Sequence, residues 1–139
     1  MTADTNCIFC KIVAGEVPCF KLSEDAETLA FMDINPVHDG HALVIPKAHY
    51  PTLFDIAPEA VAATARTAAR VAKAVNAALR PDGLNLVQSN GPGAAQSVGH
   101  FHIHVLPRRL DDELLVNWAL KPGDYAHINE IADRIRQHL

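Results

Sequence analysis

Three histidines alternate with apolar residues in the segment His100-Phe-His-Ile-His-Val-Leu106. Successive side chains of an extended strand point to opposite faces, so this spacing predicts three imidazoles on one face and apolar residues on the other. Neutral imidazole is both a nucleophile and a common metal ligand. Such a row could share one zinc ion in a hydrolase site, line a binding groove, or supply one nucleophilic histidine with two helpers.

A glycine-bearing loop, Asn90-Gly-Pro-Gly-Ala-Ala-Gln-Ser97, leads into the histidine segment. Backbone N–H groups in such loops can hold an anion, although this loop matches neither the P-loop nor the dinucleotide fingerprint. Together, the loop and the histidines favour attack by a neutral histidine on phosphorus, with the loop stabilising the phosphoryl oxygens. Because only neutral imidazole attacks, we expect the rate to fall below about pH 6.5.

The chain has three cysteines, and two of them form the motif Cys7-x-x-Cys10. This spacing is typical of one half of a tetrahedral zinc site, which needs two further ligands. A pair of buried or redox-active thiols is the alternative. We expect Cys19 to be packed without a chemical role.

The elements that must position these residues follow from hydrophobic periodicity. A short helix pattern covers 7–17, and a long one covers 58–79, with Pro58 at its start. Asp124 is placed to cap a last helix with an apolar stripe. Short runs typical of β-strands cover 19–22, 28–32, 41–45, 84–88 and 100–106. About five strands with one long helix predict an α+β fold.

Size and composition restrict the function. The chain has 139 residues, close to the commonest size of one domain, and 49% of them are hydrophobic. A net charge of −4 without a basic block argues against a nucleic-acid partner. We find no apolar run of the ~20 residues that a membrane helix needs and no signal peptide at the start, so we expect no membrane partner and a cytoplasmic protein.

The segment 100–106 resembles the signature of the histidine-triad (HIT) family, in which three histidines alternate with apolar residues. The resemblance extends to 7–13, 31–36, 40–49 and 96–98, nearly the whole chain, and is greatest to the Hint-type and bacterial branch. It implies a HIT-like α+β fold with a five-stranded antiparallel sheet, one long helix and short terminal helices. We expect a single HIT domain over 1–139, with a flexible tail at 1–6 and a C-terminal extension at 108–139.

The resemblance implies a homodimer that hydrolyses or transfers nucleoside monophosphates. His102 would attack the α-phosphate of a nucleotide conjugate and form a nucleotidyl-histidine intermediate. His104 and Ser97 would contact the phosphate and leaving group, Asp33 the ribose, and Ile34 the base. The remaining residues carried over to this site are His41, which lies beside the triad, and the nucleotide-binding candidates Ser89, Asn90 and Gln96. Ser89 is shorter than the Asn or Gln usual at its position.

The resemblance also completes the metal site, since zinc-bearing members add a Pro-x-x-His histidine and the first triad histidine. These are His49 and His100, which with Cys7 and Cys10 give a Cys2His2 set; His41 is the reserve ligand. Zinc on His100 would leave the lone pair of His102 free, so we expect a structural Zn²⁺.

Our preferred hypothesis is that the protein is a hydrolase of nucleoside phosphoramidates or similar purine nucleotide conjugates. The alternatives are a dinucleoside polyphosphate hydrolase, a metallohydrolase whose three strand histidines share one zinc, and a nucleotide-binding module without turnover. We expect a two-fold interface that uses either the long helix or the stripe of 128–139, with Trp118 near the partner's site. The other histidines, His38, His127 and His138, are assigned to the surface.

Overall fold

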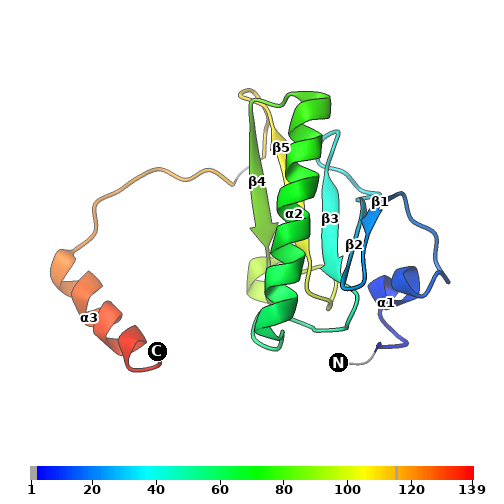
Figure 1. Cartoon of the computed structure of the whole chain (residues 1–139). Coiled ribbons are helices and arrows are strands. Elements are labelled where there is room, and N and C mark those ends of the chain that lie inside the picture. Colours follow the sequence, from blue (N-terminus) through cyan, green and yellow to red (C-terminus); the bar gives the residue numbers. More distant parts are fainter. Residues whose placement is uncertain (1–2, 115) are drawn as a thin grey trace.

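The computed structural model describes residues 3–114 and 116–139. Its centre is a five-stranded antiparallel sheet in the order β1-β2-β3-β5-β4 (Figure 1). The predicted α+β fold with five antiparallel strands is confirmed. The strands are β1 (Lys21–Glu24), β2 (Thr28–Met32), β3 (Ala42–Pro46), β4 (Gly83–Gln88) and β5 (Ile103–Arg108).

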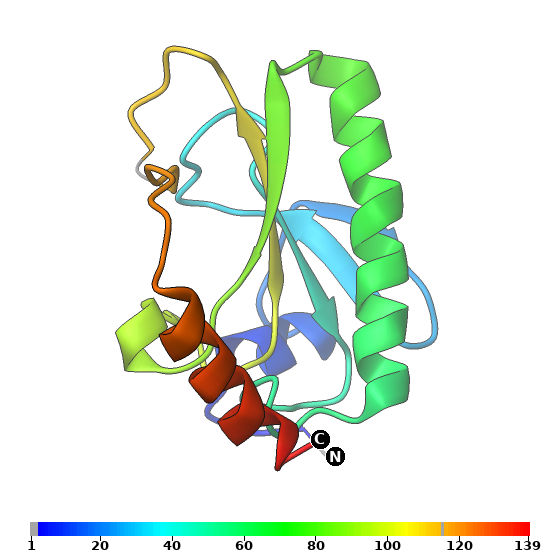
Figure 2. The same ribbon diagram turned by 90° about the vertical axis from the view of Figure 1, so that its left-hand side faces the viewer.

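One face of the sheet is covered by the long helix α2 (Pro58–Leu79) (Figure 2). Its bounds are those predicted from the apolar spacing, and Pro58 occupies the first turn. The C-cap residue Arg80 follows the helix with φ +46°, and its backbone N–H bonds to the carbonyl of Asn76. Between α2 and the sheet lies a buried core that includes Phe101, Ile103 and Val105. Phe101, Ile103 and Val105 therefore share one face, as predicted, and the structure shows that this face packs against α2.

The opposite face carries the short helix α1 (Ile8–Val13). Phe9 packs edge-on against Phe31, with ring centroids 5.5 Å apart, in a second buried cluster with Leu43. Residues 4–6, which were assigned to the tail, form a turn closed by the bond from Cys7 N to Asp4 O at 3.1 Å; residues 1–2 lie outside the described part of the chain. Successive side chains of β2 and β3 point to opposite faces of the sheet. The second cluster therefore lies on the face that carries α1, together with His102 and His104.

The C-terminal extension leaves the sheet and ends in the helix α3 (Tyr125–Arg136) (Figure 1). Asp124 caps this helix, as predicted, by accepting from the N–H of Ala126 at 3.0 Å. The start of the extension is held by Arg108, whose guanidinium donates two hydrogen bonds of 2.7 Å to the Asp112 carboxylate. All residues of α3 are exposed or half-buried, so its apolar stripe is not covered within the protomer.

Two strand starts and one surface assignment expected from the sequence were wrong. The strand expected at 19–22 begins only at Lys21, and Cys19 lies at the cavity described below. The strand expected at 100–106 begins at Ile103, because the Phe101 N–H bonds to Tyr50 O at 2.6 Å rather than to a neighbouring strand. His38 is half-buried, with Nε2 3.2 Å from Asp112, and not a free surface residue. His127 and His138 are exposed as expected.

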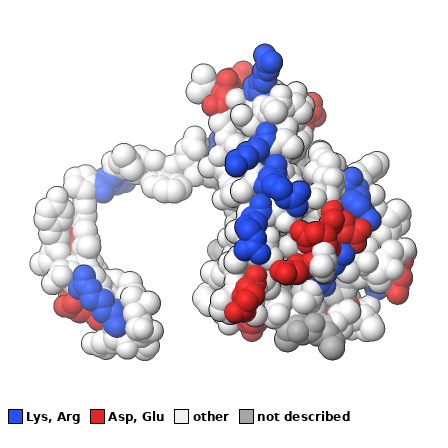
Figure 3. Space-filling model, in the orientation of Figure 1, with Lys and Arg blue, Asp and Glu red and all other residues white. Residues whose placement is uncertain are grey.

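The charges of the surface are mixed. Lys and Arg side chains gather along the outer side of α2, next to acidic side chains (Figure 3). Arg70 illustrates this pairing, because it lies 3.9 Å from Asp25 on the neighbouring turn. Among the described helices, none is long and apolar enough to cross a membrane.

Candidate active site and metal centre

One ring nitrogen of His102 is hydrogen-bonded to the backbone, and the other offers its lone pair to the cavity. Its Nδ1 lies 2.6 Å from the carbonyl oxygen of His100. A carbonyl only accepts hydrogen bonds, so Nδ1 carries the hydrogen and the lone pair of the neutral ring is on Nε2. Phe9 packs edge-on against the ring, with centroids 5.3 Å apart. The ring is 2% exposed and lines a cavity, so this geometry prepares Nε2 to act as a nucleophile there.

His104 is oriented by a chain of hydrogen bonds that begins at the backbone. The Val37 N–H donates to His41 Nδ1 at 3.1 Å, so neutral His41 carries its hydrogen on Nε2. That nitrogen lies 2.9 Å from His104 Nδ1, which must accept. His104 therefore keeps its own hydrogen on Nε2, as a donor. The Asp33 carboxylate lies 3.3 Å from the same His41 Nε2.

Glycine at position 40 lets this chain of hydrogen bonds form. Gly40 has φ +90°, and a Cβ there would lie 2.5 Å from Leu79 Cδ1 at the end of α2. This φ is strained for any residue with a Cβ, and a Cβ would also displace the Leu79 side chain, so glycine suits the turn. The turn delivers His41 directly behind His104 at the start of β3.

A cavity of about 520 Å³ lies beside His102 and His104. Asp33, Ile34 and Ser97, which the resemblance assigns to nucleotide contacts, also line it. The rest of its lining is mostly apolar and comes from α1, the 17–19 segment and strands β2 and β3. A pocket with apolar walls and a few convergent polar groups is typical of small-molecule sites.

The glycine loop uses its amide side chains internally. Gln96 accepts from the Gly91 N–H at 2.8 Å and donates to the Pro51 carbonyl at 2.7 Å. Asn90 accepts from the Leu53 N–H at 2.7 Å. Ser89 is half-buried directly after β4. These three predicted nucleotide-binding residues are outside the described lining of the cavity, and the bonds of Asn90 and Gln96 shape the loop that presents Ser97.

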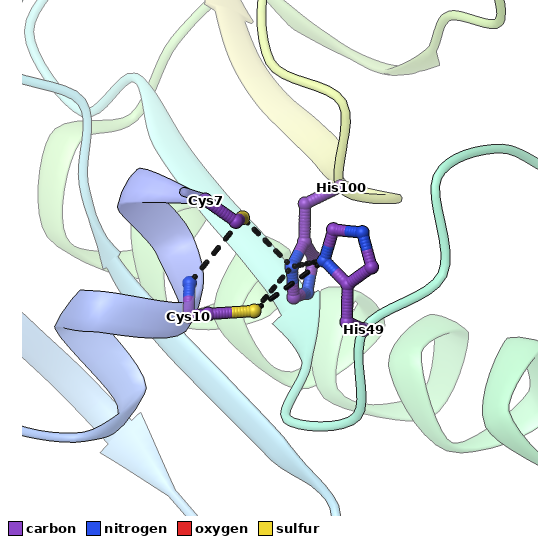
Figure 4. Close-up of side chains that lie close together, drawn as sticks. All are labelled: Cys7, Cys10, His49 and His100. Carbon is purple, nitrogen blue, oxygen red and sulfur yellow. Dashed lines mark hydrogen bonds between the residues drawn. The ribbon is translucent and has the colours of Figure 1, made fainter. Parts of the chain in front are cut away.

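A second cluster, formed by Cys7, Cys10, His49 and His100, lies behind the triad (Figure 4). His100 Nδ1 is 3.4 Å from Cys7 Sγ and 3.6 Å from Cys10 Sγ. His49 Nδ1 is 3.4 Å from Cys10 Sγ and 3.2 Å from His100 Nδ1. All four residues are buried, and their donor atoms lie within 4.8 Å of one another. The predicted Cys2His2 set is thus brought together and could hold a metal ion.

The hydrogen bonds around His100 suit it to such a site. Its Nε2 lies 2.8 Å from the Pro46 carbonyl, so Nε2 carries the hydrogen and Nδ1 offers its lone pair to the cluster. The three triad histidines do not converge on one metal, because His102 Nδ1 faces a carbonyl and His100 Nδ1 faces the thiols. This geometry contradicts the single-zinc metallohydrolase.

Asp33, His41 and His104 form another group of possible ligands within 4.8 Å. A metal on His41 Nε2 would force the hydrogen of the neutral ring onto Nδ1, where the Val37 N–H already donates. Two hydrogens would then face each other. The arrangement therefore suits a hydrogen-bond chain, and His41 is not placed to serve as the reserve ligand of the cysteine cluster.

Burial keeps the imidazoles neutral. It lowers the pKa of His104 to about 4 and lowers the pKa of His41 and His102 from the usual histidine value. Burial likewise lowers the pKa of His100 to about 4 and raises the pKa of the Cys10 thiol. The expectation of a rate that falls below pH 6.5 used the ordinary histidine pKa, and the lowered pKa of His102 predicts that the fall occurs at lower pH.

Several groups in the site were missed by sequence reasoning. Phe9 lies between the two motif cysteines and packs against His102. The other omissions are backbone groups: the Val37 N–H and the carbonyls of Pro46 and His100. Residue types carry no signal for backbone partners, although the aromatic residue inside Cys-x-x-Cys could have been noted.

An antiparallel sheet with one long helix, a His-x-His-x-His segment and a nucleophile-ready central imidazole define a histidine-triad protein. The chain belongs to this family: the HIT domain matches residues 14–111. It is 38% identical over 141 residues to adenylylsulfatase HINT3 of Arabidopsis thaliana, an alignment that covers 99% of this chain and 72% of the relative. It is 40% identical over 131 residues to adenosine 5'-monophosphoramidase HNT1 of Saccharomyces cerevisiae, covering 94% and 80%.

Solved structures agree with this assignment. A HIT family protein from Bacillus anthracis superposes with a TM-score of 0.90 at 39% identity and covers 99% of both chains. A Zn-bound histidine triad family protein from Mycobacterium smegmatis superposes with a TM-score of 0.74 at 37% identity, covering 92% of this chain and 96% of that one.

Proposed function

We propose that this protein is a nucleotide-conjugate hydrolase that releases a nucleoside monophosphate through a covalent nucleotidyl-histidine intermediate on His102. The observation that carries the proposal is the 2.6 Å bond between His102 Nδ1 and the His100 carbonyl, which leaves a lone pair on Nε2 at the cavity. The names of the relatives, an adenosine monophosphoramidase and an adenylylsulfatase, support this class of reaction.

The reaction would occur in two displacements. The Nε2 lone pair of His102 forms a bond to phosphorus, and the bond from phosphorus to the leaving group breaks with its electron pair on that group. The leaving group takes up a proton from solvent. Water then attacks phosphorus and gives up a proton to solvent, and the bond to Nε2 breaks with its electron pair on nitrogen, which returns the neutral imidazole and releases the nucleotide. The Nε2–H of His104 and the Ser97 hydroxyl would donate to phosphoryl oxygens and stabilise their charge.

We assign the cavity to a purine nucleotide. Asp33 would accept from the ribose hydroxyls, since a carboxylate only accepts and would repel a phosphate. Ile34, 76% exposed at the rim, would pack on the base. Asn90 and Gln96 support this site by shaping the loop, and any contact of Ser89 with the phosphate would come from its short hydroxyl. We propose phosphoramidates as the substrates. Dinucleoside polyphosphates are the alternative substrates and are included in the panel described below.

The buried Cys2His2 set fits a structural zinc ion. Tetrahedral zinc, with Zn–S of about 2.3 Å and Zn–N of about 2.05 Å, separates S and N donors by about 3.6 Å and two N donors by about 3.3 Å. The observed separations of 3.4, 3.4, 3.6 and 3.2 Å fit this geometry. When bound, zinc would join α1 to the segment that leads into β5, and it would leave His102 free. The Zn-bound relative structure supports the choice of metal.

We propose that the chain acts as a single HIT domain whose extension, residues 108–139, takes part in a homodimer. Two surfaces support a dimer: β4 is at the sheet edge with Leu86 49% exposed, and α3 leaves Ile128 and Ile135 more than half exposed. Trp118, 81% exposed in the extension, would lie near the partner's site. A cytoplasmic location agrees with free cysteines. Light scattering would test the dimer, and a monomer would refute it.

The function is tested by a panel of nucleotide conjugates with trapping of the modified histidine. We expect adenosine 5'-phosphoramidates to be hydrolysed and rapid acid-free quenching to leave the nucleotidyl group on the peptide that contains His102. Turnover without any modified peptide, or modification of another histidine, would refute the covalent mechanism. Binding of adenosine monophosphate without turnover of any conjugate would favour the binding-module alternative.

A further inference from the structure

The hydrogen on His41 Nε2 has two acceptors. His104 Nδ1 lies 2.9 Å away and Asp33 Oδ2 lies 3.3 Å away. The Val37 N–H occupies the other ring nitrogen at 3.1 Å, so neutral His41 has a single hydrogen to share. His41 is 4% exposed, and water has little access to supply another partner. The two acceptors therefore compete.

Asp33 can exchange this partner for a substrate hydroxyl. Its Oδ1 accepts from the Asn35 N–H at 2.8 Å, which fixes the carboxylate. Its Oδ2 is the oxygen near His41, and Asp33 also lines the cavity. A hydroxyl that donates to Oδ2 from the cavity would take the place of the long 3.3 Å contact with His41.

We propose that Asp33 and His41 are positioning residues that couple ribose recognition to the phosphate donor His104. Ribose hydroxyls on Asp33 Oδ2 release the His41 hydrogen wholly to His104 Nδ1. His104 is then fixed as an Nε2–H donor toward the phosphoryl oxygens. Without those hydroxyls, His41 is shared with the carboxylate and His104 is less firmly oriented. This inference rests on the proposed function, because it needs a nucleotide in the cavity.

The coupling predicts that the ribose affects kcat as well as KM. A net hydrogen bond of typical strength corresponds to about a 3- to 10-fold change in an equilibrium. We expect a 2′,3′-dideoxyadenosine phosphoramidate to show a kcat lower by about that factor than the ribo substrate with the same leaving group. A carboxylate that only holds the ribose would raise KM and leave kcat unchanged.

Variants separate coupling from loss of structure. His41→Gln retains an amide donor toward His104, so it keeps most of the activity, whereas His41→Leu loses it. In Asp33→Asn the neutral amide competes weakly for His41, so we expect kcat to become the same for both substrates while the KM for the ribo substrate rises. Asp39→Asn, an exposed carboxylate in the same loop, is the matched control and keeps the wild-type ratio of kcat values.

The decisive readout is histidine ¹⁵N NMR of the full chain, because the nitrogen with the hydrogen and the nitrogen with the lone pair resonate in different regions. With adenosine monophosphate bound, we expect a coupling across the hydrogen bond between His41 Nε2 and His104 Nδ1, stronger than with 2′,3′-dideoxyadenosine monophosphate. Equal signals for the two bound nucleotides, or a hydrogen on His104 Nδ1, would overturn the coupling alone. Failure of both nucleotides to bind would instead refute the nucleotide-binding function, so the two failures are distinguishable.

Discussion

Removing the metal from the Cys2His2 cluster tests whether the N-terminal helix is joined to the catalytic segment by an ion. The four donors come from α1, the segment after β3 and the segment before β5, and all are buried. Without an ion, two thiols and two imidazole nitrogens face one another in a largely apolar interior. We therefore expect chelation to destabilise the fold rather than to leave it unchanged.

The size of the effect follows from linkage. Free zinc at about 1,000 times its dissociation constant stabilises the folded state by about 4.1 kcal/mol. An unfolding entropy of about 2.1 cal/mol/K per residue, summed over the 139 residues, is about 0.29 kcal/mol/K. The quotient predicts a fall in Tm of about 14 °C on chelation.

Thermal unfolding followed by circular dichroism, together with zinc content per chain, measures this effect. Cys7→Ser is the informative variant, because Cys7 caps α1 through the Cys10 N–H at 3.4 Å and serine is a good cap. Its Tm should match that of chelated wild type. Cys19→Ser is the control and should retain one zinc per chain. Stoichiometric zinc in Cys7→Ser, or a chelated Tm within about 3 °C of the loaded protein, would refute the reasoning.

Three further predictions address the nucleophile, the titration and the core. His102→Asn retains an N–H for the His100 carbonyl, so it should fold and bind adenosine monophosphate but lose about 10⁴-fold or more in turnover, measured under single-turnover conditions. Burial lowers the pKa of His104 to about 4, so the unfolded chain takes up a proton at this residue first as the pH falls. The contribution of His104 to the free energy of unfolding should be constant above about pH 6.5 and decline between pH 6.5 and 4. Urea unfolding measures this, and no decline would contradict the burial argument. Phe101 is 1% exposed beneath α2, so Phe101→Ala should lower the free energy of unfolding by about 3–5 kcal/mol. A urea midpoint like that of wild type would be inconsistent with a tightly packed core.

Hydrophobic spacing was sufficient to predict the helices and strands whose own apolar side chains pack on the core. The 58–79 helix has an uninterrupted apolar stripe and begins with proline, and both of its bounds were predicted correctly. Strand β2 was likewise predicted over 28–32. The alternation at 100–106 indicated which side chains face α2, but it could not indicate where ladder pairing begins. Phe101 bonds to the Tyr50 carbonyl instead of to a strand, and nothing in the residue types at these positions signals that exchange.

The same limit applies to the site. Residue types and family resemblance identified the donors of the metal cluster and the side chains at the cavity. The tautomers that decide the chemistry are set by backbone groups: the His100 carbonyl for His102 and the Val37 N–H for His41. Asn90 and Gln96 have side chains that could bind phosphate, but both bond to backbone N–H groups of the protein, those of Leu53 and Gly91.

His100 makes the metal centre and the nucleophile parts of one local structure. Its Nδ1 faces the thiols, its Nε2 is fixed by the Pro46 carbonyl, and its own carbonyl fixes the nucleophile at 2.6 Å. Because one residue makes all three contacts, the two side-chain contacts hold its backbone, and with it the carbonyl that orients His102, in place. His100→Ala should therefore reduce zinc content and kcat together, while Cys10→Ser should reduce zinc content with a smaller loss of kcat, since it leaves the His100 carbonyl and its Pro46 bond intact. Equal losses of kcat in both variants would indicate that the ion, and not the His100 side chain with its bond to Pro46, holds the carbonyl that orients the nucleophile.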